Sequence, residues 1–160
     1  MLLELKLLLL IGIANGIPVL TKKQWGEKYN WPMDGGKRFV DGQPLLGPSK
    51  TLRGVILSVS LTPLAAILVG FHWEIGLLIG LFAMFGDLFS SFIKRRLRRP
   101  SSSMALGLDQ IPESLFPLLA CQASLSLSWT SIAFMVLLFF IGELVISRIL
   151  FKFNLRDTPY

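Results

Sequence analysis

Five apolar segments, each about as long as a membrane span, fill most of this 160-residue chain. A helix that crosses the hydrocarbon core of a bilayer needs about 20 mostly apolar residues. The apolar positions run around all sides of each segment and do not form one stripe, as expected for helices in lipid. The sequence therefore predicts a single all-α integral membrane domain, residues 1–160, with about five transmembrane helices. They cover residues 2–20, 54–71, 75–93, roughly 111–129, and 130–150.

Composition supports a membrane environment. Hydrophobic residues make up 52% of the chain and charged residues only 16%, whereas a soluble domain is about 25% charged. A chain of this length has one core in which to hide the surplus apolar residues, and disorder needs the opposite composition. Cys121 is the single cysteine, which excludes a disulfide framework and a cysteine-based metal site.

The net charge of +6 is unevenly distributed. Seven of the 16 basic residues lie between the first two segments, five lie between the third and fourth, and three lie near the C-terminus. Because loops rich in Lys and Arg stay on the cytoplasmic side, we predict cytoplasmic loops at about residues 21–53 and 94–110. The C-terminus would be cytoplasmic and the N-terminus outside, in a multi-pass protein of the cell membrane. We expect no nucleic-acid partner.

The third apolar segment ends in an unusual polar pattern. On a helix, Asp87, Ser91 and Lys94 share about one face, at steps of three or four residues. Asp87 lies two turns inside the boundary marked by Lys94, roughly 10 Å at 1.5 Å per residue. A carboxylate at that depth is costly unless it is paired, so it is a functional candidate. The structural alternative is a salt bridge within the membrane to Lys94 or Arg95.

A second carboxylate, Asp109, precedes the fourth segment, so two acids flank the basic run 94–99. Carboxylates with few other ligands suit Mg²⁺, which takes its remaining ligands from water and from the phosphates of a substrate. Acids for a metal beside bases for phosphate are the pattern that phosphoryl and nucleotidyl transfer require. Lys50, Thr51 and Arg53, before the second segment, are suited to gripping an anionic group. Glu143, a deep acid in the last segment, supports this site or pairs with a neighbouring helix.

These motifs together resemble the signature of the CDP-archaeol synthase family, which is related to phosphatidate cytidylyltransferases. The likeness covers nearly the whole chain. The matching stretches are Gly86-Asp87-x3-Ser91-x2-Lys94-Arg95 with Leu108-Asp109-Gln110, Pro32-Met33-Asp34-Gly35-Gly36-Lys37-Arg38-Phe39, Asp41-Gly42-x2-Leu45-Leu46-Gly47-x2-Lys50-Thr51-x-Arg53-Gly54, and Ala14-Asn15-x2-Pro18.

The resemblance implies an integral membrane enzyme that transfers CMP from CTP to a lipid phosphate, with Mg²⁺ as cofactor. By matched position, Asp87 and Asp109 would ligate the metal. The phosphates would be contacted by Ser91, Lys94 and Arg95, while Lys50, Thr51 and Arg53 would hold nucleotide or lipid phosphate and Asn15 would line the cavity. Two positions depart from the relatives. Gln110 replaces an Arg, and Glu113 is an approximate counterpart of a further acidic ligand.

The sequence is compatible with more than one lipid substrate, host, class of function and oligomeric state. The lipid is either an unsaturated isoprenoid ether phosphate, as in archaeal members, or the ester phosphatidic acid, and the host is archaeal or bacterial. A transporter that uses Asp87 and Glu143 as relays is a different class of function, and a scaffold that binds anionic membrane lipids is a third. The motif Gly76-x3-Gly80 packs helices either within one chain or between two, which leaves a homodimer open.

Overall fold

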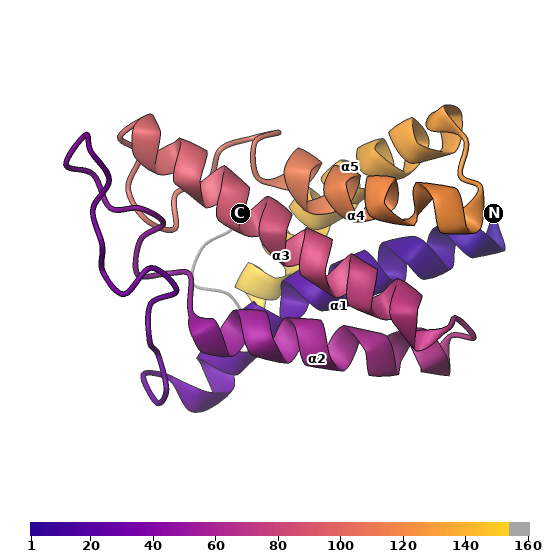
Figure 1. Cartoon of the computed structure of the whole chain (residues 1–160), viewed down its shortest axis with the longest axis horizontal. Helices are drawn as coiled ribbons and strands as arrows, with labels where there is room; N and C mark the ends of the chain where they lie inside the picture. Colours follow the sequence, from indigo (N-terminus) through magenta and orange to yellow (C-terminus); the bar gives the residue numbers. More distant parts are fainter. Residues whose placement is uncertain (154–160) are drawn as a thin grey trace.

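The computed structural model describes residues 1–153, and these residues fold into five α-helices joined by two long loops and two short turns (Figure 1). The five predicted helices are confirmed. They are α1 (Leu2–Trp25), α2 (Leu52–Leu68), α3 (Trp73–Arg96), α4 (Gln110–Leu125) and α5 (Trp129–Lys152).

The helices lie side by side, and both long loops project from the same end of the bundle (Figure 1). We call this end, which carries loop 1 (residues 26–51) and loop 2 (residues 97–109), the loop end. The opposite end carries the N-terminus and the connections at 69–72 and 126–128, and we call it the turn end. This arrangement puts the two loops that the charge pattern grouped together on one side of the bundle.

Three helices, α1, α3 and the Trp129–Ile149 part of α5, have the length and hydropathy to cross a membrane, and α2 is apolar but shorter. Large apolar side chains cover much of the outside, among them Leu64 and Leu68 of α2, Phe85 of α3, and Ile141 of α5. Such a surface is expected of a protein whose solvent is lipid. The side of the membrane that each end faces stays a prediction.

The buried apolar core lies toward the turn end. It joins the first half of α1, the start of α3, the last turns of α4 and the start of α5. Its fully buried members include Leu7, Leu10, Ile79, Leu118 and Met135. The buried polar and charged side chains are concentrated in the other half of the bundle, so the molecule has a hydrophobic half and a polar half.

Two glycines of α3 bring this helix against α2. A Cβ atom on Gly76 would lie 2.5 Å from Pro63 Cα and 2.6 Å from Ala66 Cβ, and one on Gly80 would lie 3.2 Å from Val59 Cα. Only glycine therefore fits at position 76 without a shift of the backbone. The Gly76-x3-Gly80 motif packs two helices of one chain.

Loop 1 begins later than its predicted start near residue 21, because α1 continues to Trp25. Residues 21–25 contain neither glycine nor proline, and Thr21 donates a hydrogen bond to Pro18 O (3.0 Å). The helix ends at Gly26, whose positive φ of 52° is costly for other residues. At the other side of the loop, Thr51 caps α2 by accepting a hydrogen bond from Gly54 N (3.2 Å).

Candidate active site

The site begins with a close approach of α3 and α4 at the loop end. A Cβ atom on Gly86 would lie 2.6 Å from Pro112 C and 2.8 Å from Glu113 N. Without a side chain at position 86, the backbone of α4 reaches α3 beside Asp87. Glu113 is buried, and its carboxyl group comes within hydrogen-bonding reach of Asp87.

Asp87 forms an ion pair with Lys50 of loop 1, which also donates a hydrogen bond to it. The Lys50 side chain is 19% exposed and the Asp87 side chain 17%. The salt bridge considered for Asp87 therefore exists, but its partner is neither Lys94 nor Arg95. A residue 37 positions away along the chain provides the counter-charge.

Backbone pairing within loop 1 positions Lys50. Met33 N donates to Lys50 O (2.7 Å) and Leu52 N donates to Trp31 O (3.0 Å), with an antiparallel bridge between Pro32 and Thr51. This short ladder holds the start of α2 against the beginning of the loop. These hydrogen bonds fix the position of the backbone at Lys50.

Several carboxylates act on Lys50. Burial lowers the pKa of its ammonium group, but the negative charges of Asp87, Glu113 and Asp109 outweigh burial and raise the pKa above its ordinary value. Lys50 is therefore charged at neutral pH. The three acids predicted as metal ligands all lie close enough to act on this one cation.

Asp109 forms the second lysine–aspartate pair, with Lys94 Nζ 2.7 Å from its Oδ1. Its Oδ2 accepts from Ala105 N (2.8 Å), and Lys94 also donates to Ser103 O (3.0 Å). Both side chains are largely buried, at 8% exposure for Lys94 and 14% for Asp109. Loop 2 is thus tied to the last turns of α3 through its acid.

Gln110, the departure from the related enzymes, has a local role. Its Oε1 accepts a hydrogen bond from Gly107 N (2.9 Å), and the residue is buried at 3% exposure. This bond holds the turn at Gly107, whose φ is +79°, just before α4. The amide therefore orders the backbone that carries Asp109.

Asp34 organises loop 1 from inside. Its carboxylate accepts hydrogen bonds from the N–H groups of Gly36 (2.9 Å), Leu46 (2.8 Å) and Gly47 (3.0 Å). Burial raises the pKa of Asp34, but these hydrogen bonds favour the charged form and hold the pKa below its ordinary value. The sequence placed Asp34 in a stretch that resembles the family signature but gave it no role, since nothing local indicates a partner 12 residues away.

Loop 1 also touches loop 2 beside the site. Arg95 donates to Pro100 O (2.8 Å), and Ser101 donates to Ser49 Oγ (3.0 Å). Gly47, with φ +97°, lies between them. A Cβ atom there would be 3.2 Å from Ser101 Oγ and 3.4 Å from an Arg95 guanidinium nitrogen. The two predicted cytoplasmic loops therefore form one connected cover over the end of α3.

Arg96 clamps the tip of loop 1 to α3. Its guanidinium group lies 4.6 Å from the centre of the Phe39 ring and 4.8 Å from that of Phe92, and the two rings meet edge to face. It also donates to Pro44 O and pairs with Asp41 at 3.2 Å. Sequence reasoning missed this role, because Arg96 looked like one more basic residue of the run.

Four further predicted residues occupy different surroundings. Arg53 is buried and donates to the carbonyl oxygens of Gly26 and Lys28, so it ties the turn that follows α1 to the start of α2. Thr51 uses its hydroxyl as the cap of α2. Ser91 is buried on α3, one turn beyond Asp87. The amide atoms of Asn15 on α1 are buried without a hydrogen-bond partner among the described residues.

Glu143 on α5 lies near enough to Glu113 for their charges to interact. The acidic centre thus extends toward α5. This arrangement favours a supporting role for Glu143 over a relay that runs the depth of the bundle, since the buried core toward the turn end is apolar.

The predicted metal ligands can provide part of the coordination that Mg²⁺ needs, but not a complete set of ligands. Residues 1–153 contain no group of three or more acidic, His or Cys side chains already arranged as a metal cage. Mg²⁺ is commonly held by one or two carboxylates, with water and substrate phosphates as the other ligands. Asp87 and Asp109, each now balanced by an ammonium group, provide the kind of donor that such a cation needs.

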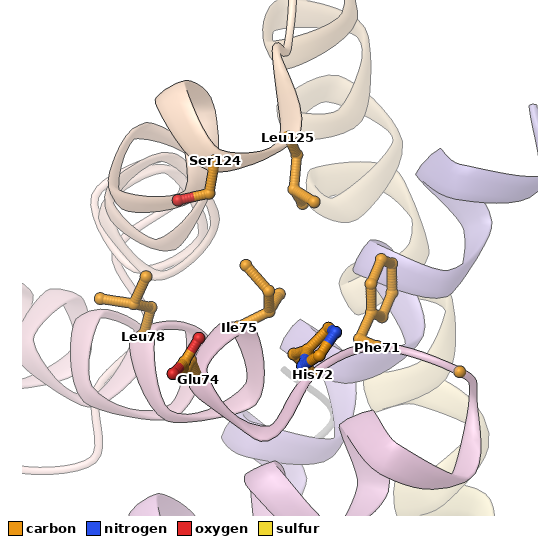
Figure 2. A pocket seen from close by; sticks show the side chains of 8 residues that line it. Phe71, His72, Glu74, Ile75, Leu78, Ser124 and Leu125 are labelled. Carbon is orange, nitrogen blue, oxygen red and sulfur yellow. The ribbon is translucent and has the colours of Figure 1, made fainter.

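A pocket of about 400 Å³ lies at the turn end, between the start of α3 and the end of α4 (Figure 2). Phe71, Ile75 and Leu125 give it apolar walls, and the exposed His72 and Glu74 stand at its edge. The acids and bases described above lie at the other end of the bundle. This pocket has no part in their chemistry.

Comparison with known proteins gives a consistent result. The family model of CarS-like CDP-archaeol synthases matches residues 5–160. A CDP-archaeol synthase of Sulfurisphaera tokodaii is 31% identical over 92% of this chain and 89% of its own length. One from Saccharolobus islandicus is 32% identical over 95% and 96%, and one from Hyperthermus butylicus is 38% identical over 69% and 67%.

A solved structure is also similar. It is described as an intramembrane enzyme for the biosynthesis of archaeal membrane lipids. It matches with a TM-score of 0.67 and 26% identity, over 86% of this chain and 90% of that one. The similarity therefore includes the helical bundle as well as the motifs.

Proposed function

The chain belongs to the CDP-archaeol synthase family, and on this premise we propose that it transfers CMP from CTP to an isoprenoid ether glycerol phosphate. The products are a CDP-archaeol-type lipid and pyrophosphate. The observation that carries this proposal at the level of residues is the pair of lysine–aspartate contacts, Lys50–Asp87 and Lys94–Asp109, at the loop end. There, acids for a metal and bases for phosphates converge from both loops and α3.

The reaction needs no covalent enzyme intermediate, because a lipid phosphate oxygen is itself a nucleophile. This oxygen attacks the α-phosphorus of CTP in line and forms the new P–O bond. The bond from the α-phosphorus to the bridging oxygen breaks, and pyrophosphate leaves with its electron pair. Since all partners are anions, catalysis consists of charge neutralisation and positioning.

Each part of the site has a place in this chemistry. Asp87 and Asp109 would hold Mg²⁺, which when bound would neutralise charge on the triphosphate. Lys50, Lys94 and Arg95 would bind phosphate oxygens. Asp34 and Arg96 keep loop 1 over the site through the contacts described above, and so position Lys50.

We place the loop end in the cytoplasm and the protein in the cell membrane. The basic residues of both loops support this orientation, and CTP is a cytosolic nucleotide. The lipid phosphate would sit at headgroup depth beside Asp87, with its tails in the bilayer.

Labelled CTP tests the proposal. Purified protein is incubated with Mg²⁺ and digeranylgeranylglyceryl phosphate, and the label is placed on the α-phosphate in one reaction and on the γ-phosphate in another. We expect the α-label in the lipid and the γ-label in pyrophosphate. Phosphatidic acid in a parallel reaction decides between ether and ester substrates. Transfer of the γ-label to lipid, or no lipid product from either acceptor, would refute cytidylyl transfer.

A further inference from the structure

Each of the two aspartates that would hold the metal already forms an ion pair with a lysine of the same chain. Asp87 pairs with Lys50 and Asp109 pairs with Lys94. The same two lysines are the groups expected to bind phosphates. Each lysine therefore has two possible anionic partners, an aspartate carboxylate and a substrate phosphate, and it cannot bind both fully at the same time.

Electrostatics makes this competition strong. The four side chains are between 8% and 19% exposed, and charges interact more strongly in such partly buried surroundings than in water. A divalent cation beside Asp87 would repel the Lys50 ammonium group, and the carboxylate oxygen that accepts from Lys50 would have to turn to the metal. A metal that binds the Asp87 oxygen now held by Lys50 therefore displaces the lysine, and a metal that binds the other carboxylate oxygen is repelled by it.

We propose that Lys50 and Lys94 are built-in counter-ions that neutralise Asp87 and Asp109 until metal and nucleotide arrive together. This inference rests on the proposed function. Two ammonium groups leave the carboxylates and one divalent cation enters, so the charge next to the acids is conserved. The released lysines move to the triphosphate, whose charge then holds them away from the metal. Nucleotide and metal binding are coupled as a result.

The two lysines differ in how firmly they are held. Lys94 also donates to Ser103 O, 3.0 Å away, and keeps that anchor when it leaves Asp109. Lys50 extends from the backbone ladder of loop 1 toward Asp87. Lys94 shares its ammonium group with Ser103 O, whereas Lys50 has Asp87 as its main partner. We therefore expect Lys50 to compete more strongly with the metal, and its removal to raise metal affinity more.

Mn²⁺ binding to purified protein without nucleotide tests the proposal, with unbound Mn²⁺ measured by electron paramagnetic resonance. Lys50→Gln should bind Mn²⁺ about tenfold more tightly than wild type, within the roughly 5- to 150-fold range of linked binding equilibria. Lys94→Gln should show a smaller gain. Lys50→Arg keeps the charge and should resemble wild type. Lys37→Gln, which removes an exposed lysine of the same loop, is the matched control.

Unchanged or weaker Mn²⁺ binding in folded Lys50→Gln would overturn the proposal, as would an equal gain in Lys50→Arg or in Lys37→Gln. Lys50→Gln retains a hydrogen-bond donor for Asp87, and if it nevertheless fails to fold, Lys94→Gln decides by the same criterion. Formation of CDP-lipid by the wild-type protein is measured separately. If the wild-type protein forms CDP-lipid but Lys50→Gln shows no gain in Mn²⁺ binding, only the counter-ion proposal is rejected. If the wild-type protein forms no CDP-lipid, the proposed function is rejected.

Discussion

In both halves of α3 a glycine allows a close contact with a neighbouring helix, but the two contacts have different roles. Near the turn end, Gly76 and Gly80 let α3 approach α2 among small and apolar neighbours. Near the loop end, Gly86 lets α3 approach α4, and the contact places Glu113 beside Asp87. A close helix contact therefore stabilises the fold in one half and assembles charged groups in the other. The sequence around each glycine, apolar or acidic, distinguishes the two uses.

One added methyl group in each half of α3 should separate its structural role from its functional role. Gly86→Ala puts a Cβ atom against the backbone of Pro112 and Glu113, and Gly76→Ala puts one against Pro63 and Ala66. Overpacking of this kind typically costs about 1–3 kcal/mol, so both variants should have a lower Tm. In the folded fraction, Gly86→Ala should lose kcat by at least about tenfold, the effect of roughly 1.4 kcal/mol, while Gly76→Ala keeps it.

Thermal unfolding in detergent and turnover per folded molecule measure the two effects. Gly80→Ala, whose Cβ atom would lie 3.2 Å from Val59 Cα, is a milder control for stability. Equal loss of kcat in Gly76→Ala and Gly86→Ala would show that the two halves are not functionally distinct.

In the polar half, Arg96 holds the tip of loop 1 against α3. Arg96→Lys keeps the charge but loses the contacts of the guanidinium group with the Phe39 and Phe92 rings. Cation–π contacts contribute about 0.5–2 kcal/mol. We expect a rise in KM for CTP of a few-fold to about tenfold, with kcat nearly unchanged. The exposed Arg98→Lys is the control, and steady-state kinetics decides. A fall in kcat at constant KM would place Arg96 in the chemistry and not in loop positioning.

Acid should weaken loop 1 slightly by protonating Asp34. Because its pKa is lower in the folded chain than its ordinary value of 3.8, Asp34 stabilises loop 1 above that pH. This contribution is lost as the pH falls through the lower folded pKa. Cleavage of loop 1 by pepsin should therefore increase over that range in wild type. Asp34→Asn should be cleaved more readily already at the upper end. Identical pH profiles for both proteins would contradict the role of the carboxylate.

Sequence reasoning located the polar half well but not its pairings. Helical spacing placed Asp87, Ser91 and Lys94 on one face, and all three are largely buried in the structure. The partner of Asp87 could not be predicted, because Lys50 is positioned by backbone hydrogen bonds between the beginning and the end of loop 1. Local periodicity carries no information on such contacts.

Arg53 illustrates the same limit. Its position before a membrane span suggests a grip on phosphate, which stays a prediction, and in the structure its side chain donates to the carbonyl oxygens of Gly26 and Lys28, just after α1. Backbone carbonyl oxygens in the turn after a helix accept hydrogen bonds from a guanidinium group, as an anionic ligand does. Residue type alone does not distinguish these two partners.

We propose that Asp87, at the contact of α3 and α4, takes part in Mg²⁺-dependent cytidylyl transfer. The most direct measurement is CDP-lipid formation by purified Asp87→Asn beside wild type, with Tm and gel filtration confirming that the variant is folded. We expect a loss of about 10²–10³ in rate, the size found when a group that stabilises transition-state charge is removed. Turnover of folded Asp87→Asn at the wild-type rate would contradict it.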